Sequence, residues 1–119
     1  TVSEVYRVMY RQALRDRSRI DELQLDLAEP TAKNGPDVAR LLGESMGEVD
    51  WWERLPQIQV PTLVLHGRYD LIPMTMSQAL AASLGQGRIV LLESGHFPYL
   101  EARDGLLSAV SSFFVDLSR

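Results

Sequence analysis

The sequence predicts an α/β protein in which two parallel strands and their flanking helices form part of a sheet, preceded by helical segments. The second half of the chain reads as strand, helix, strand and helix, an order typical of a parallel sheet with helices on its faces. The strand segments 62–66 and 88–92 are short apolar runs, as expected for strands buried on both faces. The chain has 119 residues, the size of one small domain.

The beginning of the chain predicts a helix. Thr1 and Glu4 have the spacing of a capping box, and apolar residues follow at helical intervals, which indicates a helix over about residues 2–16. Residues 18–28 alternate charged and apolar positions too closely for a firm assignment.

Residues that disfavour a helix are frequent after position 28. Residues 29–36 contain two prolines, an asparagine and a glycine, and predict a connector. Pro36 then suits the first position of a helix that extends to about Met46 and is ended by Gly47.

The second half supplies the predicted sheet. The first strand ends at Gly67, a helix follows over about residues 74–84, and the apolar stripe of residues 102–117 predicts a final helix after the second strand. Two strands do not form a stable parallel sheet by themselves, and the helices of the first half offer no matching core. We therefore expect these strands to join a larger sheet, and the chain, which begins without Met, to be part of something longer.

Composition narrows the classes of partner. The hydrophobic fraction of 45% is ordinary for a folded domain, so disorder is not expected. The net charge of −4 and the lack of a Lys/Arg-rich stripe argue against nucleic acid and an anionic membrane surface. No apolar run reaches the length of a membrane span, and the absence of cysteine excludes disulfides and thiolate metal sites. We expect a cytoplasmic location.

Two loops carry the chemistry of the predicted site. Asp70 follows the first strand and His96 follows the second, and open α/β sheets bind ligands at the carboxyl ends of their strands. A right-handed crossover between the strands would bring both loops to one edge. An aspartate beside a histidine fixes the imidazole tautomer, so that the histidine can move a proton between a hydroxyl nucleophile and a leaving group. The plainer alternatives are a turn aspartate and a loop histidine packed beside Phe97.

The motifs around these loops resemble a known family. The run from Val60 to Asp70, Val-Pro-Thr-Leu-Val-Leu-His-Gly-Arg-Tyr-Asp, and the later Gly95-His96-Phe97-Pro98 with Glu101 are similar to the C-terminal part of the α/β-hydrolase superfamily, in its branch of proline iminopeptidases, enol-lactone hydrolases, C–C bond hydrolases and esterases. The resemblance implies that Asp70 is the triad acid and His96 the general base. One departure is Arg103, where the family often has proline.

The resemblance also implies a division of the chain. Residues 1–50 would be a helical cap or lid segment, and residues 51–119 the C-terminal part of the α/β-hydrolase core. No cofactor is implied.

A convincing nucleophile is missing. The family places its serine in a Gly-x-Ser-x-Gly elbow between a strand and a helix. The letters occur once, in Gly43-Glu44-Ser45-Met46-Gly47, but the residues before them read as helix and no helix-forming run follows. We therefore interpret Ser45 as part of a helix C-terminus. The oxyanion-hole loop, which precedes the nucleophile in this family, is absent as well.

The predicted function follows from the presence of Asp70 and His96 and from the absence of a convincing nucleophile. The chain would supply the acid and base of a serine hydrolase that cleaves an ester, amide or related acyl bond, with carbon–carbon bond cleavage open on the same scaffold. The serine and oxyanion hole would lie in an N-terminal α/β-hydrolase portion, of the same precursor or a separate chain, so this chain alone would be inactive. The alternative is a non-catalytic subunit or remnant used for binding or assembly. A small-molecule substrate is expected, and homo-oligomerisation stays open.

Weaker candidates surround this pair. Trp51, Trp52 and Phe97 are candidates for substrate binding, although such aromatic residues more often pack a segment onto a core. His66 ends a buried strand and is interpreted as structural or adjacent to the pocket. A metal site made from His66 and the Asp70–His96 pair matches no compact ligand motif, so no metal is expected.

Two further residues have alternative interpretations. Glu101 either organises the loop around His96 or lies in a helix first turn, where the helix dipole favours a carboxylate. Thr1 is interpreted as a helix cap rather than an N-terminal nucleophile, because enzymes with that nucleophile place it on a strand.

Overall fold

The structure is a computed structural model that describes residues 2–23, 29–48 and 50–119. Its elements in chain order are α1 (Val2–Gln12), η1 (Arg17–Glu22), α2 (Glu29–Met46), η2 (Trp52–Gln57), β1 (Thr62–Gly67), α3 (Met74–Ser83), β2 (Gly87–Leu92), α4 (Pro98–Glu101) and α5 (Arg103–Leu117), where η denotes a short 3-10 helix. Within the described ranges, no helix is long and apolar enough to cross a membrane.

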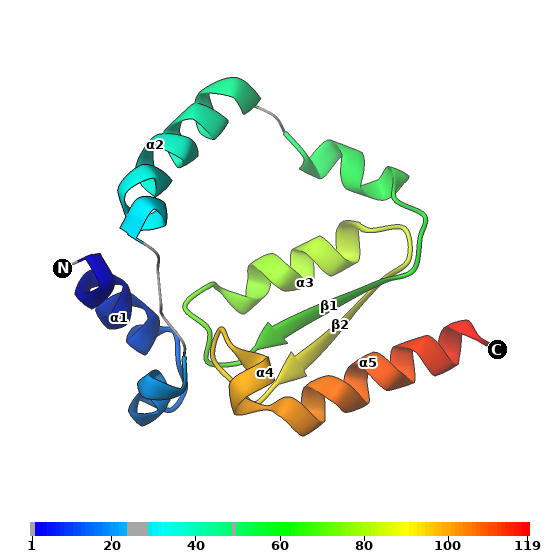
Figure 1. Cartoon of the computed structure of the whole chain (residues 1–119). Helices are drawn as coiled ribbons and strands as arrows, with labels where there is room; N and C mark the ends of the chain where they lie inside the picture. Colours follow the sequence, from blue (N-terminus) through cyan, green and yellow to red (C-terminus); the bar gives the residue numbers. More distant parts are fainter. Residues whose placement is uncertain (1, 24–28, 49) are drawn as a thin grey trace.

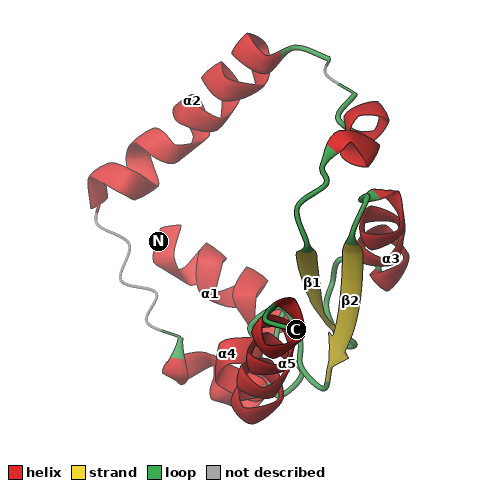
Figure 2. Ribbon diagram, turned by 90° about the vertical axis from the view of Figure 1, so that its right-hand side faces the viewer, coloured by secondary structure: helices red, strands yellow, loops and turns green. Residues whose placement is uncertain are grey.

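The two strands lie side by side and parallel, as predicted. Their residues pair in step from Thr62 opposite Gly87 to Gly67 opposite Leu92, so both carboxyl ends reach the same edge of the sheet. Helix α3 connects the strands and lies on one side of the pair, whereas α5 lies on the other (Figures 1 and 2). This arrangement places the two chemistry-bearing loops next to each other.

The structure corrects the connector predicted for residues 29–36. Helix α2 runs through them, with Pro36 inside the helix rather than at its start. A proline has a backbone angle that a helix accepts, but it lacks an N–H donor and its ring crowds the carbonyl four residues earlier, so it destabilises a helix without always ending it. The C-terminal end of α2 was predicted correctly, since the helix ends at Met46. Gly47 adopts a positive φ of 60°, which few other residues tolerate, and its N–H donates to the Gly43 carbonyl at 3.1 Å.

The remaining boundaries differ in smaller ways. Helix α1 ends at Gln12 rather than near residue 16. The single helix expected over residues 102–117 begins at Arg103, because Ala102 has non-helical backbone angles (φ −139°, ψ 45°) and separates α5 from the short α4. The capping-box residue Thr1 and part of the segment 18–28, residues 24–28, lie outside the described residues.

A small apolar core links the N-terminal segment to the loop after β2. The buried side chains of Leu14, Ile20 and Leu23 pack with Tyr10, Phe97 and Leu100. This contact brings the segment between α1 and η1, residues 13–16, against the loop that carries His96. Residues 13–16 are called the bracing segment below.

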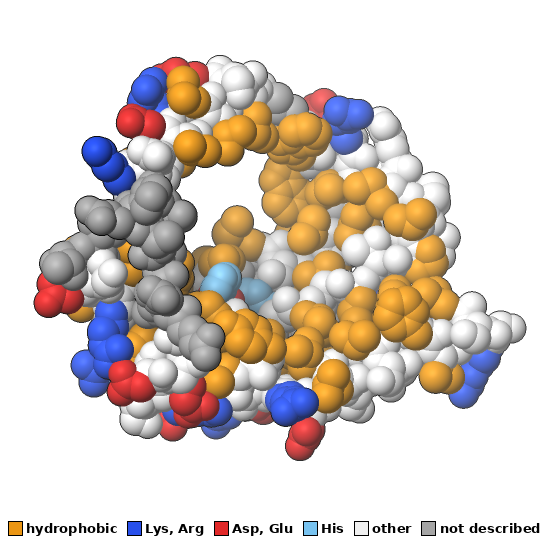
Figure 3. Space-filling model, viewed as in Figure 1, with side chains coloured by type: hydrophobic (Ala, Val, Ile, Leu, Met, Phe, Trp, Pro, Cys, Tyr) orange, Lys and Arg blue, Asp and Glu red, His pale blue; other side chains and the backbone are white. Residues whose placement is uncertain are grey.

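The chain is more open than a self-contained domain of its length. Its radius of gyration is 17.1 Å, whereas a compact domain of this length has about 13.5 Å. Its accessible area is 8696 Å², whereas a folded monomer of this mass exposes about 6,500 Å². Figure 3 shows hydrophobic side chains around a central opening in which histidine side chains are visible. The excess of exposed surface, which includes many large hydrophobic side chains, supports the expectation that the strands belong to a larger sheet.

Candidate functional site

The predicted acid and base meet at the sheet edge. The Nδ1 atom of His96 lies 2.8 Å from the Oδ2 atom of Asp70. The Asp70 side chain is 7% exposed and the His96 side chain 45% exposed. An ionised carboxylate can only accept hydrogen bonds, so the proton of the neutral imidazole lies on Nδ1. The second ring nitrogen, Nε2, is then an acceptor on a ring that solvent or another molecule can reach.

The loop after β1 fixes the carboxylate of Asp70. The Ile72 N–H donates to Oδ1 at 2.9 Å, which leaves Oδ2 for the imidazole. The Asp70 N–H donates to the Gly67 carbonyl at 3.0 Å and closes a tight turn directly after the strand. The Tyr69 N–H donates to the Ser94 carbonyl at 3.0 Å and joins this loop to the one that carries the histidine. The two oxygens of Asp70 therefore have separate partners.

The loop after β2 is held by the bracing segment. The His96 N–H donates to the Ala13 carbonyl at 2.7 Å. Gly95 lies so close to the same carbonyl that a Cβ atom there would be 2.1 Å from the Ala13 oxygen. On the other side of the histidine, the Phe97 ring packs edge-on against the imidazole at a centroid distance of 5.4 Å. Backbone and side-chain contacts thus restrict the position of His96 from both directions.

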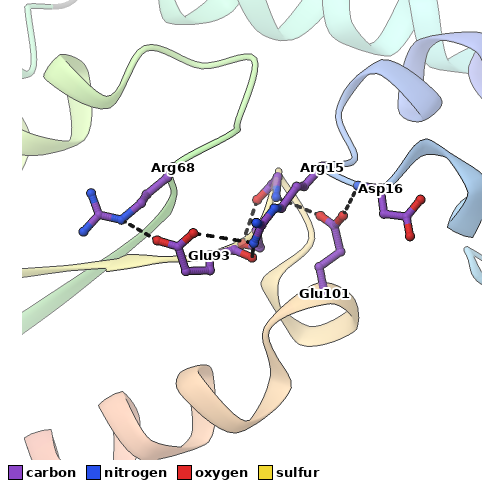
Figure 4. Close-up of polar contacts among 7 residues, drawn as sticks. Arg15, Asp16, Arg68, Glu93 and Glu101 are labelled. Atoms are coloured by element: carbon purple, nitrogen blue, oxygen red, sulfur yellow. Dashed lines mark hydrogen bonds and ion pairs between the residues drawn. The ribbon is translucent and has the colours of Figure 1, made fainter.

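Charged residues surround these contacts (Figure 4). The Glu101 carboxylate accepts hydrogen bonds from the Gly95 and Asp16 N–H groups, each at 2.8 Å. Glu93 pairs with Arg68 at 2.8 Å and with Arg15 at 3.5 Å, all with side chains about half exposed. These ion pairs join the two loops and the bracing segment at the surface, where such pairs contribute little to stability.

Asp16 has a perturbed pKa. The hydroxyl and the backbone N–H of Ser18 donate to its carboxylate and lower its pKa from the ordinary value, because both hydrogen bonds favour the charged form. This carboxylate caps the N-terminus of η1. The capped turn fixes the chain direction at the end of the bracing segment.

Sequence reasoning suggested that Glu101 could organise the loop around His96, but it identified neither the bracing segment nor the contacts that Glu93 and Glu101 make with it. Arg15 and Glu93 are separated by 78 positions, and Asp16 and Glu101 by 85. No spacing rule connects residues at such distances, and the charges of Arg15, Arg68 and Glu93 are ordinary for exposed positions. Glu101, five residues after His96, was the signal in the sequence, and it was interpreted either as organising this loop or as a carboxylate in a helix first turn.

The weaker candidates occupy different places. Phe97 contacts the imidazole, whereas Trp51 and Trp52 are 51% and 47% exposed. Trp51 lines a small surface pocket with the η2 residues Arg54 and Leu55. His66 is buried, and its Nδ1 atom lies 2.9 Å from the Ser77 hydroxyl, which gives this ring nitrogen a hydrogen-bond partner within the fold. Among the described residues, no group of three metal-ligating side chains comes together.

Ser45 lies in a helix, as interpreted from the sequence. It is an exposed residue of α2, and its hydroxyl donates to the Leu42 carbonyl at 3.0 Å. A nucleophile elbow needs a strand before the serine and a helix after it. Ser94, close to the histidine, is fully buried and donates its proton to the Gly95 carbonyl at 3.0 Å. Neither serine has the setting of a nucleophile.

Curated proteins with related sequences identify the family. The chain is 31% identical over 81 residues to a proline iminopeptidase of Saccharolobus solfataricus, an alignment that covers 67% of this chain and 26% of that protein. It is 34% identical over 70 residues to the pimeloyl-[acyl-carrier protein] methyl ester esterase of Vibrio atlanticus, which covers 57% and 27%. It is also 33% identical over 73 residues to the AB hydrolase superfamily protein YisY of Bacillus subtilis, which covers 60% and 27%. This chain belongs to the α/β-hydrolase superfamily.

The extent of the match agrees with the fold. The chain spans about a quarter of the length of these α/β-hydrolases. Its parallel strand pair with helices on both sides corresponds to the C-terminal part of the α/β-hydrolase sheet. No protein-family model matches the chain, and no solved structure matches it.

Proposed function

We propose that this chain supplies the acid and the general base of a serine α/β-hydrolase. Asp70 orients the imidazole, and His96 takes and returns the proton of a serine that lies in an N-terminal portion of the same protein or in a partner chain. The observation that carries the proposal is the 2.8 Å contact between these side chains at the ends of two adjacent parallel strands.

The geometry fits the proton transfers of acyl transfer. With its proton on Nδ1, His96 presents Nε2 as the acceptor for a serine hydroxyl. The positive charge that develops on the ring when it takes this proton lies beside the buried Asp70 carboxylate, which stabilises it. His96 then returns the proton to the leaving group. In the second half of the reaction, His96 activates a water molecule that hydrolyses the acyl-serine intermediate and restores the serine.

The reaction class follows from this chemistry and from the relatives. An activated serine attacks ester and amide carbonyls, and the matched proteins carry the names of an iminopeptidase and a methyl ester esterase. We propose cleavage of an ester, amide or related acyl bond in a small molecule. No step of this mechanism uses a cofactor.

The remainder of the sheet is the proposed partner. The chain exposes 8696 Å², about 2,200 Å² more than a folded monomer of its mass. An excess of that size is comparable with the area that obligate interfaces bury. We propose that the nucleophile-bearing portion covers it.

Helix α2 is proposed as part of a cap. It stands away from the strand pair, across the opening in which the histidine side chains lie (Figures 1 and 3). Residues 10–23, by contrast, pack on the loop after β2. In the proposed cap of residues 1–50, substrate contacts would therefore come from α2.

The test is to produce the chain together with the polypeptide encoded upstream and to assay hydrolysis of an aryl ester. His96→Ala should lower kcat by at least about a thousandfold, because the serine loses its base. The matched control is His66→Gln, which changes the other histidine and should preserve turnover. Unchanged turnover in His96→Ala would show that the assignment is wrong. A complex that forms but has no His96-dependent activity would favour a non-catalytic subunit.

A further inference from the structure

Glu101 makes two hydrogen bonds that converge on the segments around the base. Its Oε2 atom accepts the Gly95 N–H and its Oε1 atom accepts the Asp16 N–H, each at 2.8 Å (Figure 4). Gly95 directly precedes His96, and Asp16 ends the bracing segment. One carboxylate on α4 therefore connects the loop that precedes this helix with the bracing segment, 85 positions away in the sequence.

A helix-end role does not explain this arrangement. A carboxylate that stabilises a helix N-terminus interacts with the free N–H groups of its own first turn or with the N-cap. The N-cap of α4 is Phe97, and neither bond of Glu101 goes to it. Both oxygens are instead directed to N–H groups of other segments, which indicates a role in holding those segments together.

Both segments act on His96. The Gly95 N–H is bound by Glu101, and the next N–H, that of His96, is bound by the Ala13 carbonyl at 2.7 Å. Ala13 belongs to the bracing segment, which Glu101 holds through Asp16. Glu101 thus anchors the peptide before the histidine directly and the peptide of the histidine through the bracing segment.

The neighbouring ion pairs do not replace this carboxylate. Glu93 joins Arg15 and Arg68 through side chains that are about half exposed, where water screens the charges. Glu101 is less exposed and binds backbone N–H groups, which cannot move away as a long side chain can. The position of the histidine loop depends on Glu101 more than on Glu93.

We propose that Glu101 is a positioning residue that sets the imidazole of His96 against Asp70. The role rests on the proposed function, since it concerns the orientation of the proposed base. Without the Glu101 carboxylate, the Gly95 and Asp16 N–H groups lose their partner, the loop shifts, and the imidazole no longer holds its proton on the nitrogen that faces Asp70.

The experiment measures the tautomer of His96 by long-range proton–nitrogen NMR on the nitrogen-15-labelled protein, in the form in which it is purified. The unmodified protein should show a neutral ring protonated at Nδ1. Glu101→Ala should convert His96 to a mixture of both tautomers. Glu101→Gln should give an intermediate result, because its single carbonyl oxygen can accept only one of the two bonds.

Two controls separate positioning from general loss of structure. Glu93→Ala removes a carboxylate of the same charge from the loop that carries His96 and should leave the His96 tautomer unchanged. The imidazole of His66, bound to Ser77 within the fold, is an internal reference whose signals should not change in any variant. If Glu101→Ala unfolds the protein, the His66 signals change as well, and Glu101→Gln then gives the decisive comparison.

The outcomes distinguish the two proposals. Retention of the Nδ1 tautomer in both Glu101 variants overturns the positioning role and leaves the Asp70–His96 pair intact. Absence of that tautomer in the unmodified protein contradicts the pair itself, and with it both proposals. A shift of tautomer in Glu93→Ala equal to that in Glu101→Ala also overturns a specific role for Glu101.

Discussion

Replacement of Asp70 by asparagine tests the proton chemistry with almost no change of shape. One carboxylate oxygen accepts the Ile72 N–H at 2.9 Å and the other faces Nδ1 of His96 at 2.8 Å. Asparagine has a single acceptor oxygen. If that oxygen keeps the Ile72 bond, the amide NH₂ faces Nδ1, which must then accept a hydrogen bond. The ring proton moves to Nε2, where it blocks acceptance of the serine proton.

The expected loss is large. A triad acid changed to its amide lowers kcat by about 10⁴-fold through the wrong tautomer, which corresponds to roughly 5.5 kcal/mol of activation free energy. The assay is aryl-ester hydrolysis by the chain with its nucleophile-bearing portion, with the tautomer of His96 read by NMR. The matched control is Asp116→Asn on α5, which alters an exposed ion pair with Arg88 of β2 and should retain full activity. A kcat for Asp70→Asn within about tenfold of the unmodified enzyme, a difference of roughly 1.4 kcal/mol, would refute the reasoning.

Three further changes test the surroundings of the pair. Gly95→Ala places a Cβ atom 2.1 Å from the backbone oxygen of Ala13. The substitution should lower the free energy of unfolding, measured in urea, by at least about 1–3 kcal/mol. An unchanged midpoint of urea unfolding would contradict the close packing. Ser45→Ala should leave ester turnover unchanged, because this serine is a helical residue. Loss of activity would instead indicate that Ser45 is the nucleophile. The hydrogen bonds from Ser18 lower the pKa of Asp16, so its contribution to stability is present above its ordinary pKa and is lost as the pH falls through the lowered value. Asp16→Asn should therefore show a smaller loss of melting temperature on acidification, and an unchanged acid loss would contradict the contribution of this carboxylate.

The sheet and its two functional loops could be predicted because their signals are local. Apolar β-branched runs, each followed by a glycine or a polar turn, fix the ends of the strands, and the crossover rule then places Asp70 and His96 at one edge. The 2.8 Å contact confirms that these side chains meet. The interpretation of Ser45 was local as well, since the residues before it favour a helix.

The first half was harder to predict because a breaker does not always break a helix. The prolines and the glycine of residues 29–36 indicated a connector, yet α2 contains this whole segment and ends only at Gly47. Proline in a helix removes one donor, and neighbouring residues can continue the helix. The balance between the cost of a proline and the stability of the rest of the helix is not visible in a list of turn-favouring residues.

The bracing segment could not be predicted because its contacts are long-range. Glu101 suggested two roles from the sequence, and only the fold shows that its carboxylate reaches Asp16 and Gly95. The hydrogen bond from His96 to the Ala13 carbonyl depends on a backbone position that no side-chain type encodes. The surroundings of the Asp70–His96 pair are therefore less accessible to sequence reasoning than the pair itself.

The most direct test of the central claim is the rate at which a fluorophosphonate, which labels activated serines, reacts with the chain and its nucleophile-bearing partner. The account predicts that the label attaches to a serine outside this chain, and that His96→Ala slows labelling by about a hundredfold or more, the contribution of a positioned general base. A label on a residue of this chain, or an unchanged labelling rate in His96→Ala, would contradict the claim that Asp70 and His96 activate a serine supplied from elsewhere.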